Sequence, residues 1–221
     1  MSAEPEEKES RLETVVAILI AVVTVIGAIV TWRASVAADG AGDADFAGLQ
    51  ASTNAEETRA LNFVNAYEHY GAYVNYSRNL NLGNALAAEL NNAPPASAEE
   101  FFWLDRQRAE AYDIAKANQD LFPNRFLNRD GTYSVARELG EGWADAKKEK
   151  DLNPDPHYIE ADALRLKTNL LLATISLLAV GLVFFTLVES LGDRLRIPIL
   201  ILGTLFSLAG TIAAIVVEFT R

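Results

Sequence analysis

The sequence lacks cysteine altogether and contains only 2 histidines in 221 residues. Without cysteine the chain can form no disulfide, no thiolate metal site and no cysteine nucleophile. The two histidines, His69 and His157, belong to no E-x-x-H or H-E-x-x-H pattern, which helical metal sites use. We therefore expect no metal-binding residues, and we interpret both histidines as surface residues or as core residues with satisfied hydrogen bonds.

Catalytic motifs are missing as well. The sequence has no G-x-S-x-G nucleophile elbow and no glycine-rich phosphate loop. Asp39, Asp43 and Asp45 have a spacing that superficially suggests a calcium loop, but the glycine and the final glutamate of an EF-hand are absent. We therefore expect a protein that is not an enzyme, with no catalytic or cofactor-binding residues and no cofactor.

Positive charge is scarce, with 19 Lys and Arg against 30 Asp and Glu, which gives a formal net charge of −11. The carboxylates are spread over the first residues and the polar part of the chain. Such a surface repels phosphate groups, so we expect no nucleic-acid partner.

Charge is also absent from the middle of three long apolar runs, at 14–32, 168–188 and 197–219. About 20 apolar residues, at about 1.5 Å per residue in a helix, cross a hydrocarbon core of about 30 Å. Each run is therefore predicted to be a transmembrane helix. Pumps, proton-coupled transporters and voltage sensors use ionisable groups inside the membrane, so the sequence disfavours these classes.

The second apolar run continues a polar helix without a break. Residues 157–167 contain no glycine or proline, and Asp155 can cap the start of a helix. We expect one stiff helix from this cap to Leu191, which joins a soluble domain to the membrane.

The predicted fold is an all-α membrane protein with three transmembrane helices and a bundle-like helical soluble domain inserted between the first and the second. The expected segments are an acidic disordered tail (1–13), transmembrane helix 1 (14–33), a flexible linker (34–52), the soluble helical domain (53–167), transmembrane helix 2 (168–189), a short loop (190–196) and transmembrane helix 3 (197–219).

Capping signals divide the soluble domain into helices. Asn91 to Pro95 form a strong stop, and Ser97 with Glu100 form a capping box for the next helix, which we expect to end near Leu121. A turn follows at residues 128–131, where Gly131 is free to take a positive φ. A third helix is expected over residues 134–150.

Basic residues in short segments next to the membrane predict the orientation. Those that favour a cytoplasmic N-terminus are Lys8, Arg11, Arg194 and Arg196. Those on the domain side that favour the reverse are Arg33, Arg165 and Lys167. The first set prevails in our prediction, so we expect an integral protein of a prokaryotic cell membrane with a cytoplasmic N-terminus and an extracytoplasmic helical domain.

Tyrosine is concentrated in one helix of the soluble domain, at Tyr67, Tyr70, Tyr73 and Tyr76. A spacing of three residues falls 60° short of a full turn, so these side chains sweep about half of the helix circumference. They fit either a bundle core with some hydroxyls reaching water or a protein interface, where tyrosine is enriched. We list all four as candidate interface residues.

Small residues recur along the third span. The pairs Gly203 with Ser207 and Gly210 with Ala214 have the small-xxx-small spacing that lets helices approach closely in lipid. These four are also candidate interface residues.

The expected function is that of a non-enzymatic membrane scaffold or interaction subunit. It would associate with itself as a homo-oligomer, or dock into a larger membrane complex, through the helical domain and the small-residue faces. The alternative is an oligomeric pore with a path lined by the hydroxyl groups of Thr174, Ser176, Thr204, Ser207 and Thr211. The lipid bilayer is a partner in either case.

Overall fold

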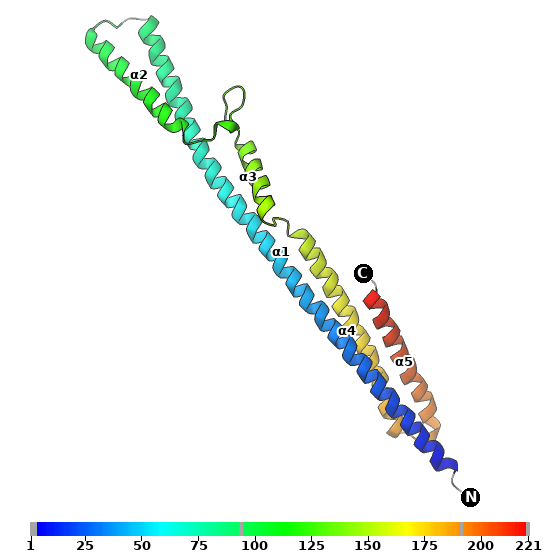
Figure 1. Ribbon diagram of the computed structural model, residues 1–221. Helices are drawn as coiled ribbons and strands as arrows, with labels where there is room; N and C mark the ends of the chain where they lie inside the picture. The colour runs from blue at the N-terminus through cyan, green and yellow to red at the C-terminus, as the bar shows by residue number, and fades with distance from the viewer. Residues whose placement is uncertain (1–3, 93–94, 191, 220–221) are drawn as a thin grey trace. The chain divides into compact units, whose positions relative to one another are not determined.

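The computed structural model describes residues 4–92, 95–190 and 192–219, and this part of the chain is helical throughout apart from its connections (Figure 1). The element order is α1 (Glu4–Asn92), α2 (Ala98–Gln119), a short 3-10 helix η1 (Asn124–Phe126), α3 (Val135–Glu149), α4 (Asp155–Ser190) and α5 (Asp193–Phe219). The all-α prediction is confirmed for these residues, which form no β-strand beyond one isolated bridge between Leu127 and Tyr133.

Three of the helices are long and apolar enough to cross a membrane, as predicted. The candidate spans lie within Leu12–Asn92, Asp155–Val188 and Arg194–Phe219. The chain divides into two compact units. We call Met1–Gln50 with Pro154–Arg221 the anchor unit and Ala51–Asn153 the inserted unit.

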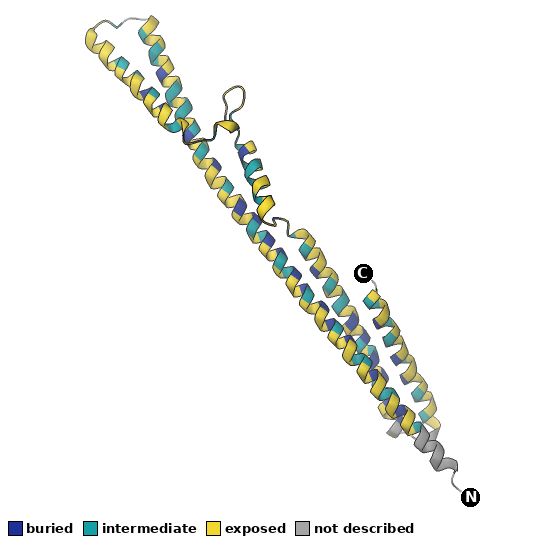
Figure 2. Ribbon diagram, viewed as in Figure 1, coloured by how far each residue is buried: buried dark blue, intermediate teal, exposed yellow. Residues whose placement is uncertain are grey.

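The first helix corrects one prediction. We expected a short span, a flexible linker at 34–52 and then a separate domain, but α1 is a single helix of 89 residues that includes the predicted linker. The reason is a heptad repeat that the glycine and aspartate content of this stretch obscures. Every seventh residue is buried on one face of α1, at Val16, Val23, Val30, Ala37, Ala44, Ala51 and Thr58. Figure 2 shows dark blue buried positions recurring along α1.

Within the anchor unit, the small residues of that face let α4 pack closely against α1. Gly40 lies against Leu164, and a Cβ added at Gly48 would be 2.7 Å from the ring of Tyr158. Glycine inside a helix costs about 1 kcal/mol relative to alanine. Close packing against α4 offsets this cost, and so residues 34–50 stay helical.

Helix ends follow the predicted capping signals in most places. Glu100 donates its backbone N–H to Ser97 Oγ at 3.2 Å, Ser134 caps α3 in the same way, and Gly131 has φ +84° in the turn. The short loop before the third span is shorter than predicted, because α5 begins at Asp193. Pro198 therefore lies inside α5.

Each unit has its own core. In the anchor unit the core joins α1, α4 and α5 through large apolar residues that include Val23, Leu171, Leu178 and Phe185. In the inserted unit it is small and aromatic, and consists of Ala72, Phe122, Phe126 and Tyr133 with Tyr73 and Tyr76 packed against them.

Candidate functional site

The predicted tyrosines divide between the core and the surface of the inserted unit. The ring of Tyr73 lies 5.7 Å from Phe122 and 5.6 Å from Tyr133, and Tyr76 lies 5.5 Å from Phe122. The Tyr73 hydroxyl also donates to the carbonyl of Gly131 at 3.1 Å. These two tyrosines therefore hold the loop after α2 against α1.

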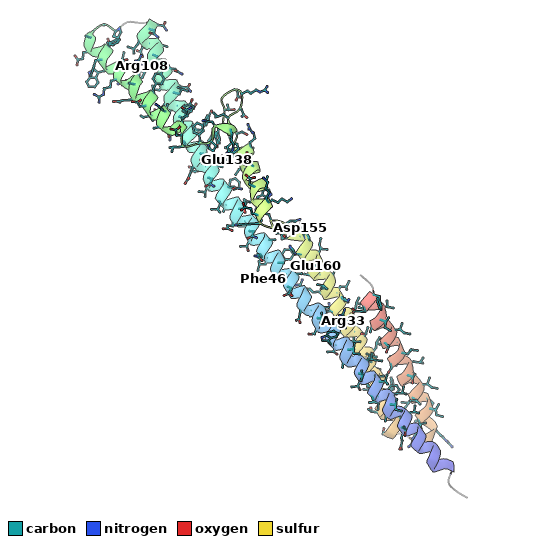
Figure 3. The ribbon with its side chains drawn as sticks, in the orientation of Figure 1. Arg33, Phe46, Arg108, Glu138, Asp155 and Glu160 are labelled. Atoms are coloured by element: carbon teal, nitrogen blue, oxygen red, sulfur yellow. The ribbon has the colours of Figure 1, made fainter. Side chains whose placement is uncertain are left out.

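A buried polar cluster lies beside this aromatic core. Glu138 of α3 is only 9% exposed, and its carboxylate accepts a hydrogen bond from the Tyr133 hydroxyl at 2.8 Å. Its other oxygen contacts Nδ1 of His69 on α1. Burial, reinforced by the hydrogen bond to Glu138, raises the pKa of Tyr133 above its usual value. Glu138 is labelled on α3 in Figure 3.

The polar cluster borders a cavity of about 180 Å³ between α1, α3 and the segment around η1. Arg125 pairs with Glu141 at 2.8 Å beside it. Gly142 allows α3 to approach α1 here, since a Cβ at this position would be 2.7 Å from Oδ1 of Asn62. The pair of His69 with Glu138 joins α3 to α1, and the pair of Arg125 with Glu141 joins η1 to α3.

Sequence reasoning missed the partner of His69. The adjacent acidic residue in the chain is Glu68, but the histidine contacts Glu138, which is 69 positions away. No local signal in the sequence indicates this pairing, because it depends on α3 burying Glu138 against α1. Among the described residues no group of three histidine, aspartate or glutamate side chains could hold a metal ion.

The outward face of α1 carries a row of exposed apolar side chains. Phe63, Tyr67, Tyr70 and Val74 follow one another at spacings of four, three and four residues, and they are 56%, 81%, 44% and 42% exposed. We call these four residues the outer stripe. His69 is two residues from Tyr67, or about 200° around the helix, so the stripe faces away from the buried polar cluster.

The four small residues of the third span are all buried in the anchor unit: Gly203, Ser207, Gly210 and Ala214. A Cβ added at Gly203 would be 2.8 Å from the ring of Phe185, and one at Gly210 would be 3.0 Å from Leu178. Gly181 of α4 faces Ser207 in the same contact. These residues therefore let α4 and α5 of one chain pack closely.

The hydroxyl groups proposed to line a pore bond mainly to their own helices. Thr174 donates to the carbonyl of Leu171 at 2.7 Å, and Thr204 donates to that of Leu200 at 2.8 Å. Thr174 and Ser207 are 4% and 7% exposed.

Comparisons with protein-family models, with curated proteins and with solved structures find no match for this chain. Over its described residues the chain is a helical protein with three helices long and apolar enough to cross a membrane. Its longest helix, α1, carries the exposed outer stripe.

Proposed function

We propose that this chain is a non-enzymatic scaffold of the membrane that associates with a second copy of itself through the outer stripe. The observation that carries the proposal is the exposure of Phe63, Tyr67, Tyr70 and Val74 on one face of α1. Apolar side chains at alternating spacings of three and four form the seam along which two helices pack.

A second copy fits this surface for two physical reasons. All copies inserted in one membrane have the same orientation, so their α1 helices meet parallel and in register, with Tyr67 beside Tyr67. The neighbouring positions on that face, Ala60 and Gly71, are small and uncharged. Two identical stripes would therefore meet without bringing like charges together.

The paired state of the buried polar groups supports a binding role over an enzymatic one. Glu138 is engaged by His69 and Tyr133, and Arg125 is engaged by Glu141. Against the alternative of a hydroxyl-lined pore stand the burial of Thr174 and Ser207 and the bonding of Thr174 and Thr204 to their own helices.

Association is tested by co-purification of two differently tagged copies from native membranes. Tyr67→Ala should reduce co-purification strongly, because buried aromatic residues at interfaces contribute about 2 kcal/mol or more each. Circular dichroism should show unchanged helix content, since Tyr67 lies outside the core. The matched control is Glu68→Ala, which truncates an exposed side chain next to Tyr67 and outside the stripe, and which should leave association intact. If Glu68→Ala abolishes association while Tyr67→Ala leaves it intact, the proposal is wrong.

We also propose the orientation with a cytoplasmic N-terminus and an extracytoplasmic inserted unit, on the count of basic residues in short segments. Because the chain has no native cysteine, single cysteines can be placed at Asn118 and Asp193 and labelled in intact cells with an impermeant reagent. Labelling at 118 alone is expected. Labelling at 193 alone would reverse the orientation.

A further inference from the structure

An ion cluster joins all three membrane helices at one level of the anchor unit. Glu218 of α5 pairs with Arg33 of α1, and its Oε2 lies 3.3 Å from Nζ of Lys167 on α4. Arg33 is one of the labelled residues in Figure 3. One carboxylate thus serves two cations, and the three side chains together retain a charge of about +1 at neutral pH.

This cluster lies at the end of the hydrophobic spans. Trp32, next to Arg33, is 61% exposed, and the guanidinium lies 5.7 Å from the centre of its ring. Tryptophan and arginine in this position are typical of the level where lipid headgroups meet the hydrocarbon. The two cations are partly accessible, with 38% of the Arg33 side chain and 25% of the Lys167 side chain exposed.

A groove of about 300 Å³ begins at the same ion cluster. Its walls are apolar and come from all three helices, with Ile26 and Ile29 from α1, Leu171 from α4, and Ile215 and Phe219 from α5. The volume is at the lower end of the range of small-molecule sites, about 300–1,000 Å³. Arg33 and Glu218 form part of its lining, so the groove has charged side chains at one end and apolar walls along the rest of its length.

We propose that this groove binds an anionic phospholipid, with one acyl chain along the apolar walls and the phosphate between Arg33 and Lys167. A phosphodiester carries one negative charge, which matches the charge left uncompensated by Glu218. A zwitterionic lipid brings an additional ammonium and matches less well. A second copy of the chain would bring another positive cluster, which these cations would repel.

The test adds phosphatidylglycerol or phosphatidylcholine to the purified full-length chain in mild detergent and measures bound lipid by native mass spectrometry. Phosphatidylglycerol should be retained in preference to phosphatidylcholine. Arg33→Gln and Lys167→Gln should each weaken retention about fivefold, which is the usual effect of one basic side chain at an anionic surface. Arg194→Gln makes the same charge change at the other end of the third span and should have no effect.

Glu218→Gln separates lipid binding from a purely structural role of the ion cluster. Without the carboxylate of Glu218, Arg33 and Lys167 can both bind the phosphate. Retention of phosphatidylglycerol should therefore rise about fivefold by the same electrostatic argument. A structural cluster would instead lose retention and stability in all three variants, and that result would overturn the proposal.

A variant of the groove keeps the proposal testable if the charge variants do not fold. Thr211→Phe fills the apolar part of the groove and leaves all three charged side chains in place, so it should reduce retention of phosphatidylglycerol. Equal retention of both lipids by the unchanged chain would overturn the proposal. So would tight binding of glycerophosphoglycerol, which has the same phosphodiester headgroup and no acyl chain.

Discussion

Gly48 of α1 lies against the ring of Tyr158 of α4, so closely that a Cβ on Gly48 would be 2.7 Å from Cε1 of the tyrosine. This contact explains why a stretch with the composition of a linker is helical. A side chain at Gly48 would push α4 away from α1, whereas glycine lets the aromatic ring cover the helix backbone.

Two neighbouring glycines give opposite predictions for the same substitution. Gly42 has nothing within 4 Å of an added Cβ, so Gly42→Ala should raise the free energy of unfolding by about 1 kcal/mol through helix propensity. Gly48→Ala should lower it, because the contact with Tyr158 must open. Both are measured by thermal unfolding of the full chain in detergent. Equal effects of the two substitutions would show that this segment of α1 does not pack on α4.

The buried carboxylate of the inserted unit gives a second prediction. Glu138→Gln leaves the hydrogen-bonding groups of His69 and Tyr133 with a poorer partner in a buried site, which should cost about 1–3 kcal/mol of stability. The matched control is Glu68→Gln, which is exposed and adjacent to His69 in the chain. Chemical unfolding followed by circular dichroism measures both. A control as damaging as Glu138→Gln would place the histidine's partner at Glu68.

The raised pKa of Tyr133 predicts a loss of stability at high pH. The folded state holds the phenol proton to a higher pH than the unfolded chain, in which the pKa is near 10. Tyr133 therefore contributes its full stability below about pH 10 and loses it progressively above, by up to about 1.4 kcal/mol per pH unit. Tyr133→Phe should flatten the decline above pH 10, and Tyr67→Phe should leave it unchanged. A decline that is identical in all three proteins would contradict the assignment.

Packing of the third span, α5, predicts different effects for the same bulky residue at two adjacent positions. Gly210→Ile should force α5 away from Leu178 and cost about 1–3 kcal/mol, as overpacking usually does. Ala209 is exposed, so Ala209→Ile should be close to neutral. Melting temperatures of the two variants in detergent make the comparison. An unchanged melting temperature for Gly210→Ile would mean that this face of α5 meets lipid.

The sequence predicts well what depends on local chemistry or on long apolar runs. The stop at Asn92, the cap at Ser97 and the positive φ of Gly131 follow from side chains a few residues apart. The three apolar helices follow from the length of their hydrophobic runs.

Features that depend on distant partners could not be predicted in the same way. Local propensity predicts a linker at residues 34–52. Gly40 and Gly48 are compatible with a helix there because they pack against Leu164 and Tyr158, which are more than a hundred positions away in the chain. The pairing of His69 with Glu138 likewise depends on how α3 packs. The sequence alone does not show that Tyr73 and Tyr76 are core residues whereas Tyr67 is on the surface. That difference depends on Phe122 and Tyr133, which pack beside Tyr73 and Tyr76.

The central claim, that two parallel copies meet along the outer stripe, is tested most directly by disulfide formation in native membranes. The chain has no native cysteine, so Ala60→Cys and Glu68→Cys each introduce a single thiol at an exposed position of α1, and neither removes a side chain of the outer stripe. Mild oxidation should convert Ala60→Cys to a covalent dimer rapidly and Glu68→Cys slowly, because position 60 lies on the face of the proposed seam and position 68 does not. Rapid dimer formation at 68 but not at 60, or at neither position, would contradict the account.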